Sequence, residues 1–427
     1  MIETVLAVDI GTTSLKSGLI TREGEVVSFY TYRFQDPNDR FIANEWLFAF
    51  NISVRRLMGK FGFAKTKNAI YQKISSIQQK IVPFQNNNGD NRSDGENDDG
   101  TQTTSFWASS SNQEIADAVH ICAVSISGNG PTVVLPNGMT VRWNEKTPEY
   151  KVDLPDAKFS LFLPKILTLK NLFTDNFNKS PYIFSGPEYL IYLLTGKPVT
   201  ILPEARFESA YWNDKILASC DIPSEKLPPF TGVGKLCGNI SHEQITSMNL
   251  GKYLDDDIPV FSAGPDFIAA MIGTNTLEAG KVCDRSGSSE GFNFCIPHQI
   301  FYDGARSLPS VIPGLWNISI LTPNSSGLFM DKRLQRVVFS INKLRQIARE
   351  NNLDFPDSMV VTGGQAKSGE FMKRKAKALH MNLIVSDCVD AELIGDACCG
   401  WYGLGAYTSL QEAARAIFKK SIVYKGL

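Results

Sequence analysis

A turn near the start of the chain carries residue types that can bind phosphate groups. In the segment VLAVDIGTTSLKSGLI at positions 5–20, Gly11 follows an apolar run and lets the backbone approach a ligand closely. Amide and hydroxyl groups in such a turn can donate hydrogen bonds to phosphate oxygens. The polar side chains that follow the glycine are Thr12, Thr13, Ser14 and Lys16.

Asp9, just before this turn, is a candidate magnesium ligand. Its carboxylate can hold Mg²⁺ through water, because Mg²⁺ gives up its hydration shell reluctantly. A second apolar run follows the turn, so the segment is predicted as strand, turn and strand. It is therefore not a P-loop, in which Gly-Lys-Ser/Thr leads into a helix. An ordinary hairpin with a polar turn is the alternative interpretation.

Two later turns have similar chemistry. DRSGSSEG at 284–291 is rich in small and hydroxyl residues, and VTGGQAKS at 361–368 lies between a predicted strand and a predicted helix. A Gly-Gly pair at that junction lets a nucleotide lie against the backbone, and the helix N-terminus adds a partial positive charge. Either turn alone is typical of a tight connection. Their occurrence in one chain favours a nucleotide site.

The elements that would hold these turns follow from the pattern of apolar residues. Short apolar runs ending at glycine predict buried strands at 5–11, 121–127, 259–264 and 358–364. A helix is predicted at 186–196, where Pro187 stands in the first turn and Gly196 ends it. Ser409 with Glu412 predicts a capping box at the start of a late helix. Strands that alternate with helices indicate an α/β protein.

One long region between these elements differs from the rest. A helical pattern runs from Ala43 to about Lys80, and the segment 86–104 that follows it contains no apolar residue. A segment that buries nothing cannot offset the entropy cost of ordering, so it is interpreted as a flexible surface insertion.

Composition excludes several classes of protein. The 427 residues include 43 basic and 44 acidic side chains, so no general basic character favours nucleic-acid binding. No apolar run approaches the ~18 residues of a membrane helix, and the first residues lack the basic region of a secretory signal. Eight scattered cysteines and four histidines make a structural zinc site an unfavoured interpretation. These features predict a cytoplasmic protein with reduced thiols.

Taken in order, the segments resemble the FGGY carbohydrate kinases, the group of xylulokinase, gluconokinase and glycerol kinase. The similarity runs from residue 5 to about 415 and rests on the set of motifs rather than on any one of them. The motifs are DIGTTSLKSGL, SISGNGPTVVLPNG, GPEYLIYLLTGKPVT, PPFTGVGKLCGNI, AGPDFIAAMIG, RSGSSEG, VTGGQAKSGEFMKRKAKAL and AELIGDACCGWYGLGAYTSLQEAA.

The resemblance implies an α/β fold of two RNase H-like domains, as in the actin-like ATPase superfamily, with the active-site cleft between them. It places a sugar-side domain at 1–273, including the insertion at 86–104, and a shortened nucleotide-side domain at 274–427. It also implies transfer of the γ-phosphoryl group of ATP to a hydroxyl of a small sugar, sugar acid or polyol, with Mg²⁺ as cofactor. A homodimer is a further expectation.

By the same resemblance, Asp266 is the expected general base, which accepts the proton of the attacking hydroxyl. Without the motif around it, Asp266 would be interpreted as a helix N-cap. Asp9 is the expected metal ligand. The expected phosphate-binding residues are Gly11, Thr12, Thr13, Ser14, Lys16, Gly287, Ser288 and Ser289. The expected nucleotide-binding residues are Gly363, Gly364, Gln365 and Lys367, and the expected substrate-binding residues are Asn129, Gly130 and Asp266.

Some positions depart from the family pattern. Pro265 stands where glycine is usual, and Asn129 stands where glutamine is common. Only 73 residues separate Ser289 from Gly363, which is short for the family. These departures leave two alternatives open. One is a nucleotide- or sugar-binding protein with little or no turnover, and the other is an ATPase that acts without a sugar.

Overall fold

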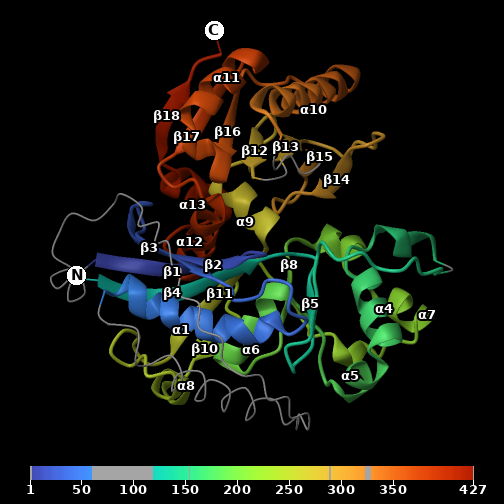
Figure 1. Ribbon diagram of the computed structural model, residues 1–427, viewed down its shortest axis with the longest axis vertical. Helices are drawn as coiled ribbons and strands as arrows, with labels where there is room; N and C mark the ends of the chain where they lie inside the picture. Colours follow the sequence, from blue (N-terminus) through green and yellow to red (C-terminus); the bar gives the residue numbers. More distant parts are fainter. Residues whose placement is uncertain (1, 60–118, 153, 288–289, 323–327, 427) are drawn as a thin grey trace.

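Two large β-sheets organise the chain, with helices between and around them (Figure 1). The computed structural model describes residues 2–59, 119–152, 154–287, 290–322 and 328–426. The predicted insertion at 86–104 and the later part of the predicted helix at 43–80 lie outside these ranges. None of the described helices is long and apolar enough to cross a membrane.

The first sheet has the strand order β10-β11-β4-β1-β2-β3. β1 is antiparallel to β2, β2 is antiparallel to β3, and β4 and β11 run parallel to β1. Its strands are β1 (Ile2–Ile10), β2 (Ser14–Ile20), β3 (Val26–Arg33), β4 (Val119–Gly128), β10 (Gly238–Ile240) and β11 (Ile258–Pro265).

The second sheet has the same arrangement when the first is written from its other edge, as β3-β2-β1-β4-β11-β10. Its strand order is β15-β13-β12-β16-β17-β18, with β14 added beside β15. Again a three-stranded antiparallel meander adjoins two parallel strands, as expected for a pair of RNase H-like units. Its strands are β12 (Val282–Ser286), β13 (Glu290–Ile296), β14 (Arg306–Pro309), β15 (Trp316–Leu321), β16 (Ser358–Thr362), β17 (Asn382–Ser386) and β18 (Lys420–Tyr424).

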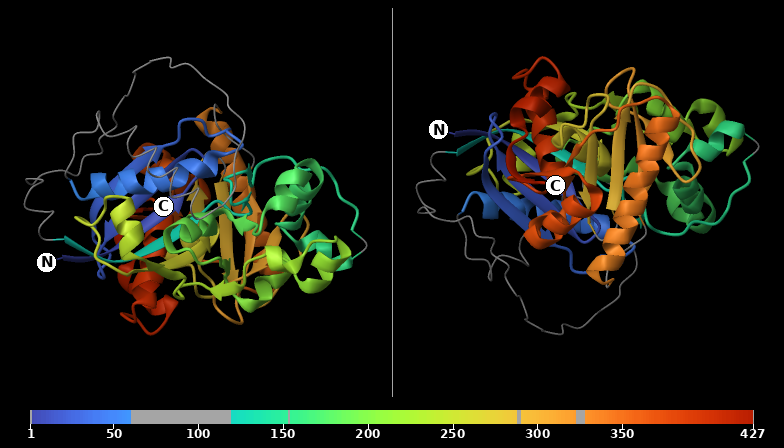
Figure 2. Two further views of the ribbon diagram at one scale, coloured as in Figure 1. Left: turned by 90° about the horizontal axis from the view of Figure 1, so that it is seen from below. Right: turned by 90° about the horizontal axis from the view of Figure 1, so that it is seen from above.

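Helices pack on both faces of the first sheet, further helices pack on the second sheet, and another group forms a side region beyond the first sheet (Figures 1 and 2). They are α1 (Trp46–Leu57), α4 (Leu163–Leu172), α5 (Thr174–Lys179), α6 (Gly186–Thr195), α7 (Asp214–Ser219), α8 (His242–Ser247), α9 (Asp266–Gly273), α10 (Met330–Glu350), α11 (Gly369–Leu379), α12 (Ala391–Gly403) and α13 (Leu410–Ile417). Two small sheets join β5 (Val133–Val134) with β6 (Thr140–Val141) and β7 (Phe184–Ser185), and β8 (Thr200–Leu202) with β9 (Phe230–Gly232).

The predicted strands and the helix at 186–196 are confirmed, whereas the helix predicted from Ala43 begins as α1 at Trp46 and ends at Leu57, earlier than predicted. The four predicted strands are β1, β4, β11 and β16, and the helix predicted at 186–196 is α6, which ends at Gly196 in the left-handed conformation (φ 70°). The late capping box forms in part. Ser409 accepts a hydrogen bond from the backbone N–H of Glu412, but the Glu412 carboxylate accepts from Thr408 instead of Ser409.

The apolar core has two parts. The larger part joins the first sheet to α1, α6, α9, α12 and α13, and the smaller part joins the second sheet to α10 and α11. α12 and α13 come late in the chain but pack against elements of the first half, with α12 on β1 and β4 (Figure 1). The boundary near residue 273 stays a prediction, because the core of the first half draws on both ends of the chain.

The contact between α9 and α12 depends on two glycines. A Cβ atom on Gly395 would lie 1.9 Å from the carbonyl oxygen of Ala269, and one on Gly273 would lie 1.9 Å from that of Ala391. No side chain fits at such distances without moving one helix away from the other. The glycines therefore set the spacing of the helix pair from which the acid Asp266 projects.

Gly395→Ala should therefore lower the free energy of unfolding by about 1–3 kcal/mol, because overpacking outweighs the gain of up to ~1 kcal/mol in helix propensity. Chemical denaturation measures the change. Gly251→Ala is the matched control, since the added methyl group would lie 3.9 Å from its nearest neighbour, an atom of Ile245, and it should change stability little. Equal stability of both variants would contradict the close helix contact.

Candidate active site

Three strands of the first sheet end side by side, and the predicted site residues follow their ends. Ile10 of β1 pairs with Gly128 of β4, and Pro265 of β11 pairs with the same glycine. The carboxyl ends of parallel strands meet at one edge of a sheet. Gly11, Asn129 and Asp266, each one residue further on, are therefore brought together there.

The first hairpin places Asp9 opposite Lys16 on β2, as the strand–turn–strand prediction required. The Lys16 ammonium lies 3.7 Å from the Asp9 carboxylate and 2.9 Å from that of Asp390. Burial alone would lower the pKa of Lys16, but Asp9, Asp390 and Glu392 raise it above its usual value. Lys16 is therefore a fixed positive charge at the floor of the site.

Asp9 is 4% exposed and has a carboxylate oxygen, Oδ1, with no hydrogen-bond partner. Burial raises the pKa of Asp9 against the opposing effect of Lys16, and the carboxylates of Glu392 and Asp266 raise it further. A buried carboxylate oxygen without a partner, among other acids, is a donor set that suits a hard divalent cation. The residues present therefore fit Mg²⁺.

Asp266 is the first residue of α9, and the N-cap position belongs to Pro265. The alternative interpretation of Asp266 as an N-cap is therefore wrong. Its half-buried carboxylate accepts a hydrogen bond from the Phe267 backbone N–H. Burial raises the pKa of Asp266 to about 6, while the positive charge of Arg285 opposes the rise and Glu392 adds to it. A carboxyl with such a pKa is suited to proton transfer near neutral pH.

A pocket opens beside Asn129 and the first hairpin. Thr12 Oγ1 accepts hydrogen bonds from the Asn129 amide (3.2 Å) and from the indole N–H of Trp143 (3.0 Å). The pocket combines aromatic surface with a few polar groups, as small-molecule sites do. It is lined by Ile10, Gly11, Thr12, Phe34, Ile42, Trp46, Asn129, Thr132, Thr140, Arg142, Trp143, Gly186 and Pro187.

Gly130 connects this pocket to Asp266. A Cβ atom on Gly130 would lie 3.0 Å from the Cβ of Pro265, so the turn after β4 packs directly on the residue before Asp266. Any larger side chain at Gly130 would push these two turns apart. Gly130 thus lies in contact with Pro265, one of the departures from the family pattern.

In the second half, the turn between β12 and β13 lies against the start of the segment that follows β16. The Gly287 carbonyl accepts hydrogen bonds from the Gln365 side-chain amide and, at 3.5 Å, from Arg333. A Cβ atom on Gly363 would lie 2.7 Å from the Ser286 carbonyl oxygen, whereas one on Gly364 would meet no atom within 4 Å. Gly364 therefore leaves open space beside the backbone.

The remaining predicted residues of this half are less tightly placed. Lys367 is exposed at the end of the short 3-10 helix Gly364–Lys367. Ser288 and Ser289 lie outside the described residues. Thus the structure brings Gly287, Gly363 and Gln365 together in the second half. In the first half it brings Asp9, Lys16 and Asn129 to the edge at which the parallel strands β1 and β4 end.

Sequence reasoning missed several charged groups of the site. Asp390 and Glu392, at the start of α12, act on Lys16 and Asp9, and Arg285 on β12 acts on Asp266. Asp390 and Glu392 lie more than 370 residues from Asp9, so local spacing gives no signal for them. Arg285 stands inside the quoted motif RSGSSEG, and its charge beside small residues was an available signal.

Lys375 lies elsewhere than the basic run around it would by itself predict. The run at 373–377 reads as a solvated helix face, but Lys375 is fully buried. Its ammonium contacts the carboxylate of Asp284, that of Glu290 at 2.9 Å and the Ser286 hydroxyl at 3.2 Å. It therefore ties together β12 and β13 just below the turn at Gly287.

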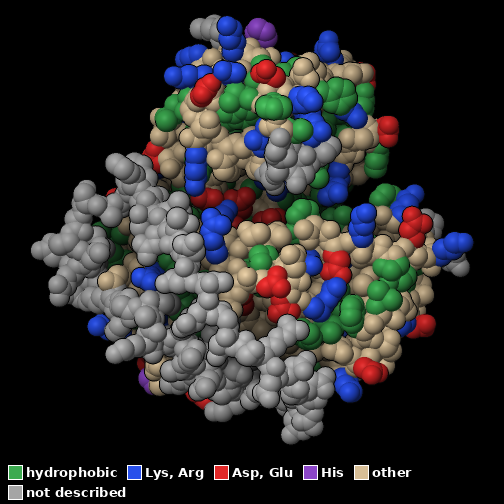
Figure 3. All heavy atoms as spheres, viewed as in Figure 1, with side chains coloured by type: hydrophobic (Ala, Val, Ile, Leu, Met, Phe, Trp, Pro, Cys, Tyr) green, Lys and Arg blue, Asp and Glu red, His purple; other side chains and the backbone are tan. Residues whose placement is uncertain are grey.

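The space-filling view shows a hollow between the parts built on the two sheets, with acidic side chains inside it (Figure 3). The charge coupling of Asp266 to both Lys16 and Arg285 agrees with a site shared by the two halves. Residues from β1, β2, α9, β12 and α12 contribute to it.

Comparison with solved structures identifies the fold. The gluconate kinase of Lactobacillus acidophilus is 13% identical, with a TM-score of 0.67, over 100% of this chain and 94% of that one. Glycerol kinase of Plasmodium falciparum with ADP is 13% identical (TM-score 0.67; 99% and 94%), and xylulose kinase of L. acidophilus is 14% identical (TM-score 0.64; 99% and 94%). No protein-family model and no curated protein sequence matches the chain.

The chain therefore has the two-domain α/β fold of these gluconate, glycerol and xylulose kinases. The fold class predicted from the sequence is confirmed, and the predicted resemblance to sugar kinases is confirmed at the level of the fold. Similarity to these and related kinases at 12–14% identity establishes the fold. The substrate has to be inferred from the residues of the site.

Proposed function

We propose that this protein transfers the γ-phosphoryl group of ATP to a hydroxyl of a small sugar, sugar acid or polyol. The observation that carries the proposal is the position of Asp266. It follows Pro265, which packs against Gly130 next to the Asn129 pocket. Its pKa of about 6 is influenced by Arg285 and Lys16, one positive charge from each half.

In the proposed reaction, the substrate hydroxyl gives its proton to the Asp266 carboxylate as its oxygen attacks the γ-phosphorus. The new oxygen–phosphorus bond forms while the bond from the γ-phosphorus to the bridging oxygen breaks, and ADP leaves with that oxygen. Such transfer depends mainly on positioning and on stabilisation of charge.

Phosphate binding is assigned to both hairpins. Backbone and hydroxyl groups of the first turn would donate to phosphate oxygens, and Lys16 and Arg285 would balance their charge from opposite sides. The proposed phosphate-binding residues are Gly11, Thr12, Thr13, Ser14, Lys16, Gly287, Ser288 and Ser289. Asp9 would hold Mg²⁺, which neutralises phosphate charge when bound.

The nucleotide and the acceptor would occupy separate places. Gly363, Gly364 and Gln365 would carry the adenosine part, for which the open space at Gly364 gives room, with Lys367 at its edge. Asn129 and Gly130 would bind the acceptor, and Trp143 would provide an apolar face beside it. A cytoplasmic location and a homodimer stay predictions.

The test is a screen for ADP release with Mg-ATP and a panel of ketoses, aldoses, sugar acids and polyols. We expect one compound or a few close relatives to raise ADP release strongly above the rate with ATP alone. If no compound in the panel leads to ADP release, while Mg-ATP still raises the melting temperature, the result would instead support a binding protein. ADP release that no compound accelerates would support an ATPase.

Arg285→Gln should lower kcat by about 10- to 100-fold, the effect of one charge-assisted contact of about 1.5–3 kcal/mol. It should also move the acid limb of the activity profile to higher pH. Arg285 lowers the pKa of Asp266, so its loss raises that pKa above about 6. Because the base must be deprotonated, activity is lost as pH falls through this pKa.

The pH profile of kcat/KM measures the shift. Arg374→Gln, at an exposed arginine that pairs with Glu370 on α11, is the control and should keep the wild-type profile. An unchanged acid limb in Arg285→Gln would show that Arg285 does not act on the base.

A further inference from the structure

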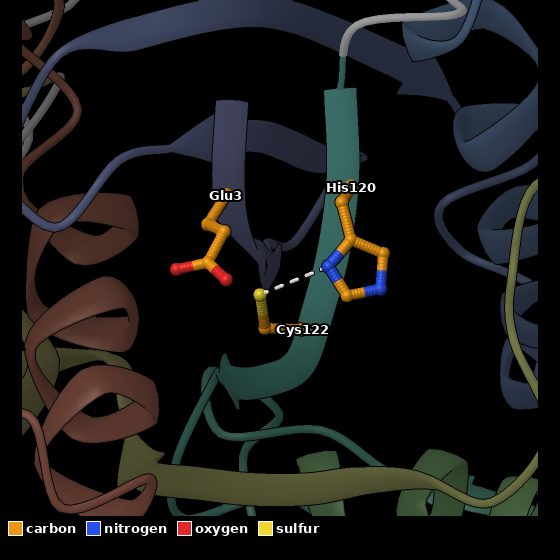
Figure 4. A group of neighbouring side chains, drawn as sticks. All are labelled: Glu3, His120 and Cys122. Atoms are coloured by element: carbon orange, nitrogen blue, oxygen red, sulfur yellow. Dashed lines mark hydrogen bonds between the residues drawn. The ribbon is translucent and has the colours of Figure 1, made fainter. Parts of the chain in front are cut away.

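A group of metal-binding side chains lies on the first sheet, away from the candidate active site. Glu3 of β1 and His120 and Cys122 of β4 each direct one ligand atom to a common point, and these atoms all lie within 4.8 Å of one another (Figure 4). Cys122 Sγ is 3.4 Å from His120 Nδ1. Among the described residues, this is the one group of three with such geometry.

The sheet itself creates the group. His120 and Cys122 are two residues apart on one strand, so their side chains point to the same face. β1 runs parallel to β4 with Glu3 in register with His120, which adds a carboxylate from the neighbouring strand. Three ligands are thus held by paired backbone rather than by a loop.

The histidine is oriented by a fourth residue. His120 Nε2 lies 2.7 Å from Asp255 Oδ2, so the neutral ring carries its proton on Nε2 and donates it to that carboxylate. The lone pair of Nδ1 then faces Cys122 and Glu3. A carboxylate that holds the far nitrogen of a histidine is the usual support of a metal-bound imidazole.

Charge around the group favours a cation. The Cys122 thiol donates a hydrogen bond to His120 Nδ1, and the carboxylates of Glu3 and Asp255 flank this pair. A divalent ion would replace this proton, with release of H⁺, and would balance the carboxylate charge. Glu3 is exposed and His120 is about a third exposed (35%), so an ion can enter from solvent.

We propose that Glu3, His120 and Cys122 form a Zn²⁺ site, in which thiolate, imidazole and carboxylate are the protein ligands and water completes a tetrahedron. Zinc is the ion of choice because it accepts sulfur, nitrogen and oxygen ligands together. The sequence disfavoured a structural zinc site because its eight cysteines are scattered and only four histidines accompany them.

This site is independent of the proposed kinase activity. Glu3 and Asp9 are six residues apart on one strand, which corresponds to about 20 Å at ~3.3 Å per residue. Metal bound at Glu3 therefore touches no group of the proposed reaction, and the zinc proposal can fail or succeed whatever the screen for ADP release shows.

The test is titration of the purified full chain with Zn²⁺ and, separately, with Co²⁺ as a spectroscopic probe. We expect one equivalent of metal per chain and a thiolate-to-cobalt charge-transfer band. Cys122→Ser should remove the band, and Asp255→Asn should weaken affinity by about 10- to 100-fold, as loss of a supporting carboxylate does. His242→Ala is the matched control, because His242 forms a 2.7 Å pair with Asp256 that resembles the His120–Asp255 pair.

Several outcomes would overturn the proposal. Absence of stoichiometric metal binding by the wild-type chain would leave only a thiol–imidazole hydrogen bond at this place. A cobalt band that persists in Cys122→Ser would assign the thiolate to another cysteine. Equal loss of affinity in His242→Ala would indicate binding to surface histidines in general. Circular dichroism of each variant checks that the chain is folded.

Discussion

Asp266→Asn should reduce turnover by about 10²–10⁴-fold while leaving Mg-ATP affinity nearly unchanged. The amide keeps the size of the side chain but cannot accept the hydroxyl proton. Phosphate contacts come from the two hairpins, so nucleotide binding does not depend on this carboxylate. Initial rates with the best acceptor from the panel, together with calorimetric titration of Mg-ATP, measure the two quantities separately.

Asp214→Asn is the matched control, because Asp214 is also the first residue of a helix, α7, and is exposed. It should behave as the wild type does in both measurements. Near-normal turnover by Asp266→Asn would contradict the assignment of Asp266 as the general base. Loss of nucleotide affinity along with turnover would instead mean that the substitution disturbs the phosphate site.

Lys375→Met should destabilise the protein by about 3–5 kcal/mol, because it leaves the carboxylates of Asp284 and Glu290 buried without their cation. Lys375 is fully buried, and burial raises the pKa of Asp284 while Lys375 opposes that rise. Methionine fills a similar volume, so the loss is one of charge rather than packing. Chemical denaturation of the variant and the wild type gives the difference.

A triple variant separates charge from shape. Adding Asp284→Asn and Glu290→Gln to Lys375→Met removes the unpaired charges and should recover part of the lost stability. Lys373→Met, at an exposed lysine of the same helix, should change stability by no more than about 0.5 kcal/mol. If Lys375→Met behaved like Lys373→Met, the buried ion cluster below Gly287 would be contradicted.

Local features of the chain were predicted well because their causes are local. The hairpin at Asp9 and Lys16, the helix that ends at Gly196 and the strand that leads to Asp266 each depend on residues within one short segment. The buried position of Lys375 also has a local signal. It lies three residues from Met372 and four from Leu379, on the buried face of α11.

Other features could not be predicted because they arise where distant segments pack together. Asp390 reaches Lys16 only because α12 lies on the first sheet, and Arg285 acts on Asp266 only because the two halves face each other. The Glu3–His120–Cys122 group likewise requires the parallel register of β1 and β4. Periodicity and motif spacing carry no information about such pairings.

The measurement that tests the proposed function most directly is the fate of the γ-phosphoryl group. With the best acceptor and Mg-ATP, mass spectrometry would quantify the phosphorylated acceptor, and a colorimetric assay would quantify inorganic phosphate. We predict one phosphorylated acceptor for each ADP and little inorganic phosphate. ADP formation matched by inorganic phosphate, with no phosphorylated acceptor, would contradict transfer to a hydroxyl and show that water is the acceptor.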